Sequence, residues 1–413
     1  MRLLFLSLGV PLPVNNGHKM RTWSILCGLA AEGHEIDFLT FAQPEEAGRE
    51  CRELSRICRD VQMVPLTLHN LTSSSDYWGR LRGLFSSRPY ATRRFSSERM
   101  RRCIQASLDR GNLDAIVCDT VYSACNLPQT SLPLILNNVD VEHVILERYL
   151  PFESNPAKRL YARLESRKVK NWEQKICQKS TIGMACSEHD RRALQALAPQ
   201  LPMFVVPNVV DTETYTPGDS DAEDPNGIVY QGGMDWFPNR DAVEYFVSQI
   251  FPMIRREIPG VRFIVAGRNP SEEFRKQFVK TPGVEFTGTV PDMRPVIAKA
   301  TLCVVPLRIG SGTRLKILEA GAMAKGMVST PLGAEGLDFR DGEEICIASN
   351  SVEFAEAVVA LMKNPSRRNE LGHAARRKVL GQYSMDALQQ ALRIALNSSS
   401  LKITEPERAI IAR

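Results

Sequence analysis

A glycine-rich segment in the second half of the chain contains the residue types that bind an anion at a helix N-terminus. The segment, "RIGSGTRLKILEAGAMAKG" at residues 308–326, has four small loop residues before the predicted helix: Gly310, Ser311, Gly312 and Thr313. Glycine lets the backbone approach a ligand closely, and the free N–H groups of a helix start favour negative charge. Arg314 and Lys316 add positive charge, and Glu319 is placed one turn into the helix, where it can accept hydrogen bonds from sugar hydroxyls. The alternative is an ordinary helix start with a surface Lys316–Glu319 pair.

Two further glycine loops follow predicted strands, and together with the first loop they indicate which kind of anion the protein binds. Gly232 and Gly233 lie in "IVYQGGMDWFPNRDA", and Gly17 lies in "PLPVNNGHKMRTW". The phosphate-loop pattern is absent, and Leu315 stands where a dinucleotide fingerprint needs its third glycine. In open parallel sheets, ligands bind beyond the carboxyl ends of the strands. Three such loops, from both halves of the chain, predict a cleft that closes on a phosphate-bearing ligand.

Alternating strands and helices must position these loops, and the chain shows that alternation throughout. Short apolar strands are predicted at residues 3–8, 36–41, 115–118, 134–136, 182–185, 228–230, 263–265, 284–287, 302–306 and 328–330. Helical periodicity separates them. Strands that are apolar on both faces and alternate with helices indicate parallel sheets covered on both sides. We therefore expect an α/β protein.

A Pro-, Asp- and Gly-rich stretch at residues 207–227 predicts a linker between two α/β units of similar size. The expected organisation has four parts: an N-terminal domain at 1–207, a second domain at 208–383, a helix at 384–396 that packs back on the first domain, and a flexible tail at 397–413. The linker also contains Asp219, Ser220 and Asp221, a metal-binding D-x-D pattern in other enzymes, which we interpret here as solvated.

Motifs in both halves resemble the retaining GT-B glycosyltransferases of family 4, over about residues 1–396. The second half carries "GGMDWFPNRDA", "FIVAGRNP", "VEFTGTVPDM" and "GSGTRLKILEAGAMAKGMVSTPLGAEGL". The first half carries "NNGHKMRTWSILCGLAAEGHEIDFLT" and "NVDVEHVILER". The resemblance implies a GT-B fold, with two Rossmann-like domains facing across a cleft and a nucleotide-sugar donor bound mainly by the second domain.

The resemblance also implies roles for single residues. Glu319 matches the ribose-binding Glu of the family's E-x7-E pair, Gly17 lies near the diphosphate, and Val290 holds the base edge through its backbone. The full predicted donor-binding set is Gly17, Gly232, Gly233, Arg268, Val290, Gly310, Ser311, Gly312, Thr313, Arg314, Lys316 and Glu319. The implied reaction needs no metal, no cofactor and no covalent enzyme intermediate. The leaving diphosphate is stabilised electrostatically and takes the acceptor proton while the new bond forms on the same face.

Three departures from the family pattern leave the catalytic residue open. Ser311 stands at the first Glu of E-x7-E, and the cations expected after the first strand of the second domain are missing, so that Arg314 and Lys316 are the candidates to replace them. The histidine of the family's strand-end motif aligns with Val139. The remaining catalytic candidates there are Asp140, Glu142 and His143.

A basic segment at residues 78–102 contains eight arginines and one acid, Glu98, together with four aromatic residues. Arginines and aromatics together suit an anionic bilayer and a lipid-linked acceptor. The same cations would also suit an anionic acceptor, and a solvated helical face is the plain alternative. Nucleic-acid binding is disfavoured because no recognition module is evident.

Composition limits the remaining choices. The 413 residues suit two domains, and no apolar run approaches the roughly 20 residues of a membrane helix. Ten cysteines without a C-x-x-C motif indicate reduced thiols in a cytoplasmic protein, one that could lie at the inner face of the membrane.

From the motifs and the resemblance together, we expect a retaining glycosyltransferase that moves a sugar from a UDP- or GDP-sugar to a polysaccharide, lipid-linked or other acceptor. The alternatives are a GT-B sugar-nucleotide epimerase and a catalytically silent GT-B module that binds a sugar nucleotide or a membrane.

Overall fold

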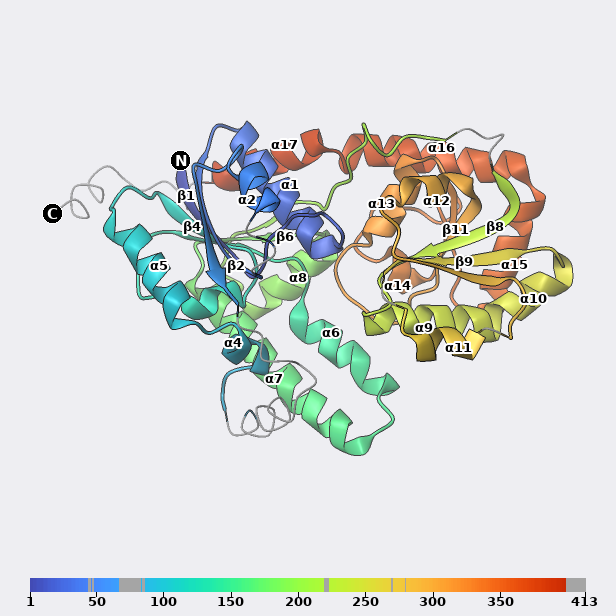
Figure 1. Ribbon diagram of the computed structural model, residues 1–413, viewed down its shortest axis with the longest axis horizontal. Coiled ribbons are helices and arrows are strands. Elements are labelled where there is room, and N and C mark those ends of the chain that lie inside the picture. Colours follow the sequence, from blue (N-terminus) through green and yellow to red (C-terminus); the bar gives the residue numbers. More distant parts are fainter. Residues whose placement is uncertain are drawn as a thin grey trace. The chain divides into compact units, whose positions relative to one another are not determined.

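The chain forms two compact α/β units (Figure 1). The computed structural model describes residues 1–43, 46, 48–66, 83, 86–218, 223–268, 270–278 and 280–398. Unit 1 contains Met1–Pro207 and the chain from Leu388 onwards, and unit 2 contains Asn208–Ala387. The D-x-D pattern, the first part of the basic segment and nearly all of the predicted tail lie outside the described residues.

Unit 1 is built on a seven-stranded parallel sheet with the order β3-β2-β1-β4-β5-β6-β7. Its strands are β1 Arg2–Ser7, β2 Glu35–Ala42, β3 Asp60–Pro65, β4 Ala115–Cys118, β5 Leu134–Asn137, β6 Ile182–Ala185 and β7 Met203–Val205. Its helices are α1 Gly17–Ala31, α2 Arg49–Leu54, α4 Tyr90–Arg94, α5 Glu98–Asp109, α6 Glu142–Tyr149, α7 Pro156–Lys179 and α8 Glu188–Leu197, with 3-10 turns η2 Ser123–Asn126 and η3 Leu150–Phe152. The central strands β4, β5 and β6 are buried along their whole length, as expected for a parallel sheet covered on both faces.

Unit 2 has a six-stranded parallel sheet with the order β10-β9-β8-β11-β12-β13. Its strands are β8 Asp224–Gln231, β9 Arg262–Ala266, β10 Val284–Gly288, β11 Ala300–Val305, β12 Gly326–Ser329 and β13 Cys346–Ile347. Its helices are α9 Phe237–Tyr245, α10 Phe251–Glu257, α11 Glu272–Phe278, α12 Arg294–Lys299, α13 Leu315–Ala322, α14 Pro331–Ala334, α15 Ser351–Lys363 and α16 Pro365–Gln382, with a π-helical turn at Phe246–Ile250. Its core includes a cluster of fully buried aromatic side chains: Phe246, Phe251, Phe263 and Phe354.

The last helix, α17 (Met385–Leu396), supplies two leucines to the core of unit 1. Leu388 and Leu392 are fully buried, and they lie against α1 at Gly28. A Cβ atom at Gly28 would lie 2.6 Å from Leu388 Cδ2 and 2.7 Å from Leu392 Cδ1. Figure 1 shows α1 and α17 side by side at this point, although they stand at opposite ends of the sequence. Glycine at position 28 therefore permits a close helix contact.

Candidate functional site

Two glycine loops meet at the carboxyl edge of the sheet in unit 2, because β8 and β9 are neighbouring parallel strands. The N–H of Gly232 donates to the carbonyl of Ala266 at 2.9 Å. Gly267 has φ +149°, and a Cβ atom there would lie 2.0 Å from the carbonyl oxygen of Gly232. Glycine is therefore required at position 267, where the backbone is both left-handed and in close contact. Neither Gly267 nor its contact was anticipated from the sequence.

The loop at residues 310–313 has two glycines with positive φ, and the side chain of Arg314, the next residue, holds its backbone through hydrogen bonds. Gly310 has φ +142° and Gly312 has φ +73°. The buried guanidinium of Arg314 donates to the carbonyl oxygens of Ser311 and, at 2.8 Å, Gly312. Thr313 Oγ1 accepts from Asn208 Nδ2 at 2.7 Å. The contacts of Arg314 thus shape the loop, and α13 begins directly after it at Leu315.

Lys316 is a largely buried cation in the first turn of α13. Its Nζ donates to Tyr230 Oη at 2.9 Å and to Asn239 Oδ1 at 3.1 Å, and it lies 4.2 Å from the centroid of the Tyr230 ring. Burial and, to a smaller extent, the charge of Arg314 lower the pKa of the ammonium to about 7, while the charge of Glu319 opposes the shift. No carboxylate of the described residues pairs with Nζ, so an anionic ligand would supply the missing counter-charge.

Glu319 faces two hydrogen-bond donors that sequence reasoning missed. Its Oε2 accepts from Gln231 Nε2 at 2.6 Å, and its Oε1 accepts from Tyr215 Oη at 3.4 Å. Burial raises the pKa of the carboxyl to about 7, against the hydrogen bond from Tyr215 and the charge of Lys316. Gln231 directly precedes Gly232 at a strand end, a position that could have signalled its role. Tyr215 lies in the predicted linker, where the sequence carries no such signal.

The other predicted donor-binding residues of unit 2 also follow strand ends. Gly233 follows β8, and Arg268 follows β9, where its Nε lies 3.2 Å from Asp235 Oδ2. Val290 is partly buried and follows β10, the edge strand beside β9. Strands β10, β9, β8 and β11 are consecutive in the sheet, so that one edge of unit 2 carries all the predicted donor-binding residues that fall in it.

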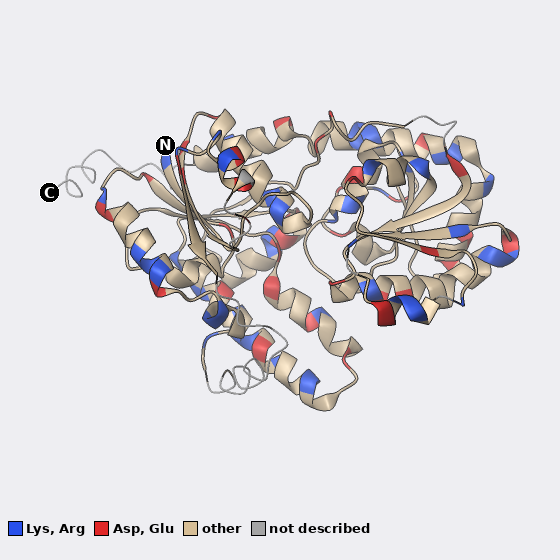
Figure 2. Ribbon diagram, viewed as in Figure 1, with Lys and Arg blue, Asp and Glu red and all other residues tan. Residues whose placement is uncertain are grey.

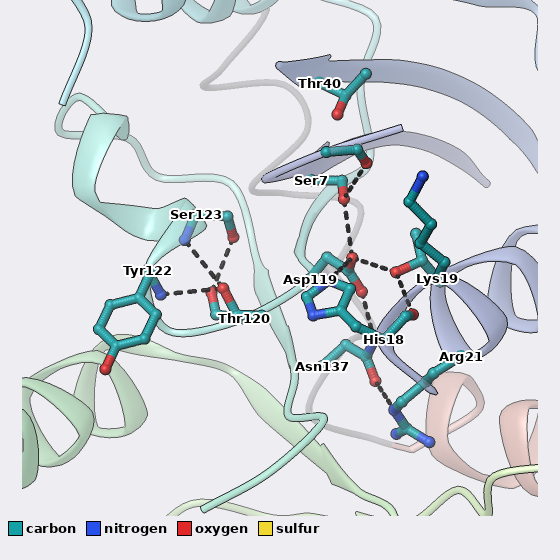
Figure 3. Close-up of polar contacts among 12 residues, drawn as sticks. Ser7, His18, Lys19, Arg21, Thr40, Asp119, Thr120, Tyr122, Ser123 and Asn137 are labelled. Carbon is teal, nitrogen blue, oxygen red and sulfur yellow. Dashed lines mark hydrogen bonds and ion pairs between the residues drawn. The ribbon is translucent and has the colours of Figure 1, made fainter. Parts of the chain in front are cut away.

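A second polar cluster lies at the carboxyl edge of the sheet in unit 1, centred on the fully buried Asp119 (Figure 3). Its Oδ2 accepts from Thr22 Oγ1 at 2.6 Å and Ser7 Oγ at 3.0 Å, and its Oδ1 accepts from Asn137 Nδ2 at 2.8 Å. The ring Nε2 of His18 lies 3.3 Å from Oδ2. The ends of β1, β4 and β5, which are adjacent strands, thus place three of these residues together with the start of α1.

Sequence reasoning missed His18 and Asp119, although Asp119 directly follows a correctly predicted strand and His18 directly follows the predicted Gly17. Gly17 is the first residue of α1, which is capped by the side chain of Asn16. Arg21, on the next turn, is also buried: its Nε donates to Asn137 Oδ1 at 3.0 Å and its Nη1 donates to the carbonyl of Val206 at 2.8 Å.

The three catalytic candidates named from the sequence follow β5, Asp140 in the loop and Glu142 and His143 in the first turn of α6, in different surroundings. His143 is buried, and its Nδ1 lies 2.6 Å from Oε2 of the fully buried Glu173, so this histidine is held inside unit 1. Burial, with the charges of Asp140 and Glu173, raises the pKa of Glu142 well above its usual range. The charge of Asp140 contributes to the raised pKa of His18. All three candidates therefore interact with residues of unit 1, Glu173 or His18, that the sequence did not reveal.

The described part of the basic segment presents several arginines on α4 and α5 (Figure 2). Arg93, Arg94 and Arg99 are exposed, whereas Arg101 and Arg102 form ion pairs with Glu98. Within the described ranges, no helix combines the length and the apolar character needed to cross a membrane. All ten cysteines are free thiols.

The two parallel α/β units have the GT-B fold, which confirms the fold expected from the sequence. Residues 225–364, within unit 2, match the family described as glycosyl transferases group 1. The family match lies within unit 2, and the likeness to the solved structures shows the fold of the chain.

The similarity to individual proteins is distant but extends over almost the whole chain. The protein is 22% identical over 388 residues, 91% of this chain and 94% of the relative, to an uncharacterized 44.6 kDa protein in the cps region of Klebsiella pneumoniae. Its structure is similar to that of sucrose-phosphate synthase from Thermosynechococcus elongatus, with a TM-score of 0.71, 15% identity and coverage of 95% and 98% of the two chains. It is also similar to HepE from Anabaena in complex with UDP and glucose, with a TM-score of 0.64, 14% identity and coverage of 96% and 99%.

Proposed function

We propose that the protein transfers a sugar from a UDP- or GDP-sugar to a hydroxyl group of an acceptor, with unit 2 binding the donor. The observation that carries this proposal is Lys316, a largely buried ammonium group at the start of α13 to which no described carboxylate pairs. A diphosphate would provide that counter-charge, and it would raise the pKa of Lys316 from about 7. The family match and the UDP bound by HepE support a nucleotide ligand.

Glu319 and the glycine loops would complete the donor site. Each oxygen of Glu319 already accepts one hydrogen bond, and each can accept a second one from a ribose hydroxyl. The backbone N–H groups after Gly310 and Gly312 would face the diphosphate, because glycine lets the main chain approach a ligand. In this proposal Lys316 and the helix start stabilise the negative charge that develops on the leaving diphosphate.

The finer features of the reaction follow from the resemblance. We propose transfer with retention of anomeric configuration and without a metal or other cofactor. Proton NMR of the product gives the configuration directly, and activity in EDTA tests the metal independence. For the acceptor we propose a polysaccharide or lipid-linked glycan. The exposed Arg93, Arg94 and Arg99 would then contact an anionic membrane surface at the cytoplasmic face.

The test begins with thermal unfolding in the presence of UDP, GDP, ADP or NAD, with wild-type protein and Glu319→Ala. A ligand at about 100 times its dissociation constant stabilises the folded state by about 2.7 kcal/mol. We expect one of the nucleoside diphosphates UDP and GDP to raise Tm in the wild type and to lose most of that effect in the variant. The absence of a shift with both would contradict the proposal.

Turnover then separates the possible activities. Wild-type protein with the matching sugar nucleotide and glycan acceptors should release nucleoside diphosphate and form a new glycoside. Binding without turnover would instead assign a silent sugar-nucleotide module. Recovery of the donor with scrambled stereochemistry at C2 would assign an epimerase.

A further inference from the structure

Helix α7 of unit 1 exposes cations to solvent but buries both of its acids, Glu165 and Glu173. A helix of its 24 residues is about 36 Å long. Figure 1 shows α6 and α7 as a hairpin that extends away from the sheet of unit 1, and Figure 2 shows Lys and Arg along α7. The exposed cations of the helix form what we call the cationic face of α7: Lys158, Arg159, Arg163, Arg167, Lys170, Lys175 and Lys179.

The two acids of α7 do not neutralise this face, because both are engaged inside unit 1. Glu165 Oε2 accepts from the backbone N–H of Tyr90 at 2.9 Å, and its Oε1 accepts from Lys168 Nζ at 2.8 Å. Glu173 Oε2 accepts from the backbone N–H of His143 at 3.1 Å. Within the described part of the chain, no carboxylate lies within ion-pair distance of any cation of the face.

Other exposed arginines of unit 1 have an acid on their own helix. On α8, Arg192 Nε lies 2.9 Å from Glu188 Oε1, although the arginine side chain is 75% exposed. On α5, Arg102 Nε lies 3.6 Å from Glu98 Oε1. The cationic face of α7 differs from both, because its positive charge remains available to an anionic partner.

The turn that leads into α7 exposes two large apolar side chains. Phe152, in η3, is 39% exposed, and Leu160, near the start of α7, is 59% exposed. Polar contacts hold the turn in place: the side chain of Asn155 caps α7, and Arg159 Nε donates to the carbonyl of Glu153 at 2.8 Å. The folded turn therefore keeps apolar surface in water at the start of the cationic face, and burial of that surface would be favourable.

We propose that the α6–α7 hairpin docks on an anionic lipid bilayer, with Phe152 and Leu160 inserted at the interface and the cationic face of α7 on the headgroups. Lysines and arginines are attracted to a negatively charged bilayer, and apolar side chains gain by leaving water for the acyl chains. Stable attachment to a membrane requires two such signals together. A free anionic glycan would use the cations but would not bury the exposed Leu160.

This inference rests on the membrane contact within the proposed function and assigns it a different surface. The exposed arginines of α4 and α5 supply charge alone, whereas the hairpin supplies charge and an apolar tip on one rigid element. Attachment of the hairpin to a bilayer does not require sugar transfer or nucleotide binding. Vesicle binding and nucleotide binding are therefore measured separately.

The experiment measures co-sedimentation of the full chain with vesicles of phosphatidylcholine alone, or of phosphatidylcholine and phosphatidylglycerol in a ratio of about 2:1. One variant removes three cations of the face together: Arg163→Gln, Arg167→Gln and Lys170→Gln. A second variant, Leu160→Ser, removes the larger part of the exposed apolar tip.

Two matched controls make the same chemical changes elsewhere, and a third variant tests the competing surface. Ile394→Ser replaces an aliphatic side chain on α17 that is 60% exposed. The control for charge removes three exposed cations of unit 2: Arg275→Gln, Lys276→Gln and Lys280→Gln. The variant for the competing surface removes the exposed arginines of α4 and α5: Arg93→Gln, Arg94→Gln and Arg99→Gln. The Tm of each variant, with and without UDP or GDP, reports folding and donor binding.

We expect the wild type to bind the mixed vesicles far more tightly than phosphatidylcholine alone. Each cation near such a surface contributes about fivefold to the partition coefficient, so the triple variant of α7 should lose about 100-fold. Leu160→Ser should lose about 10-fold, and both controls should stay within about twofold of the wild type. In Leu160→Trp, the added tryptophan should fluoresce at a shorter wavelength once the protein is bound to vesicles.

Four results would overturn the inference: wild type that does not prefer the mixed vesicles, losses in the unit 2 control as large as in the α7 variant, a loss confined to the α4 and α5 variant, or unchanged emission of vesicle-bound Leu160→Trp. Retention of the wild type on dextran sulfate without vesicle binding would overturn it in favour of an anionic glycan. A wild type that binds vesicles but shows no change of Tm with UDP or GDP would contradict the proposed donor site alone.

Discussion

The two units place polar residues at the same edge of similar parallel sheets, but the chemistry at the two edges differs. In unit 2 the edge is built from glycine backbone and from Lys316, a cation that no described carboxylate pairs with. In unit 1 the edge is built around Asp119, a carboxylate with four hydrogen-bonding neighbours. The fold thus determines where a ligand can bind, while the side chains after each strand decide which ligand and which step.

The largest expected effect tests whether the edge of unit 2 depends on glycine backbone while the edge of unit 1 does not. Gly267→Ala would place a Cβ atom 2.0 Å from the carbonyl oxygen of Gly232 at φ +149°. We expect a loss of about 3–5 kcal/mol in the free energy of unfolding, measured by urea denaturation. Gly9, after β1 in unit 1, has no atom within 4 Å of the corresponding Cβ position. Gly9→Ala should therefore stay within about 0.5 kcal/mol of the wild type, and equal losses in both variants would remove this contrast.

A second contrast between the units concerns chain continuity. Unit 2 is one continuous segment, whereas unit 1 takes Leu388 and Leu392 from the end of the described chain. Leu392→Ala should destabilise unit 1 by about 2–4 kcal/mol, because it leaves a cavity against α1. Hydrogen exchange of α1 amides measures this effect within the unit concerned. Ile394 on the same helix is 60% exposed, and Ile394→Ala should leave the exchange rates of α1 unchanged.

How far the sequence predicts this fold depends on where each element lies in its sheet. The strands at residues 115–118 and 182–185 are continuous apolar runs, and the structure confirms both with the same bounds. The edge strands β3, β7 and β13 were missed. Strand β3, "DVQMVP", is only partly buried, and β7 and β13 have three and two residues, so that none of them carries the long apolar pattern of a central strand.

The same reasoning explains which site residues could be predicted. Gly310, Lys316 and Glu319 stand within ten positions of each other, so that local spacing suffices to suggest a common site. His18 and Asp119 are 101 positions apart, and only the pairing of β1 with β4 brings them together. A single sequence carries no strand order, and therefore it could not reveal the pair.

The next prediction sharpens the description of unit 2 as an anion site. Lys316→Met keeps much of the side-chain volume but removes the charge, and it should raise the Kd of the bound nucleoside diphosphate about 10-fold to 100-fold, as expected for a lost charge-assisted hydrogen bond. Isothermal titration calorimetry measures the change. Lys276→Met, at a 70% exposed side chain on α11, is the matched control and should leave the Kd unchanged.

The loss of nucleotide binding in Lys316→Met should not be accompanied by a loss of folding stability. A buried ammonium group is expensive to desolvate, so Lys316→Met should unfold at the same or a higher urea concentration than the wild type. A variant that loses binding and stability together would indicate that Lys316 supports the fold, and the contrast between the Lys316 edge of unit 2 and the Asp119 edge of unit 1 would lose its main support.

The smallest expected effect concerns Glu319 and the pH dependence of stability. The pKa of its carboxyl is about 7 in the folded protein and 4.5 when unperturbed, so the folded state binds the proton more tightly. The stability that this proton contributes is fully present below pH 4.5 and is lost as the pH rises through 7. Glu319→Gln cannot ionise and should retain it. We expect the variant to exceed the wild type by about 1–2 kcal/mol in free energy of unfolding at pH 8, after allowance for partial solvent exposure, and to match it near pH 4.5.

Glu319 and Asp119 differ in how completely their carboxylate oxygens are hydrogen-bonded. Asp119 in unit 1 has hydrogen-bonding neighbours at 2.6 to 3.3 Å around both oxygens, whereas Glu319 has one short donor, Gln231, and one long one, Tyr215. A carboxylate that is costly to ionise in the free protein gains most when a ligand brings its own donors, because those hydrogen bonds favour the charged form. A saturating nucleoside diphosphate should therefore reduce the difference between wild type and Glu319→Gln at pH 8 or reverse its sign. A difference that stays constant across pH, with and without the nucleotide, would show that Glu319 neither titrates in this range nor contacts the ligand.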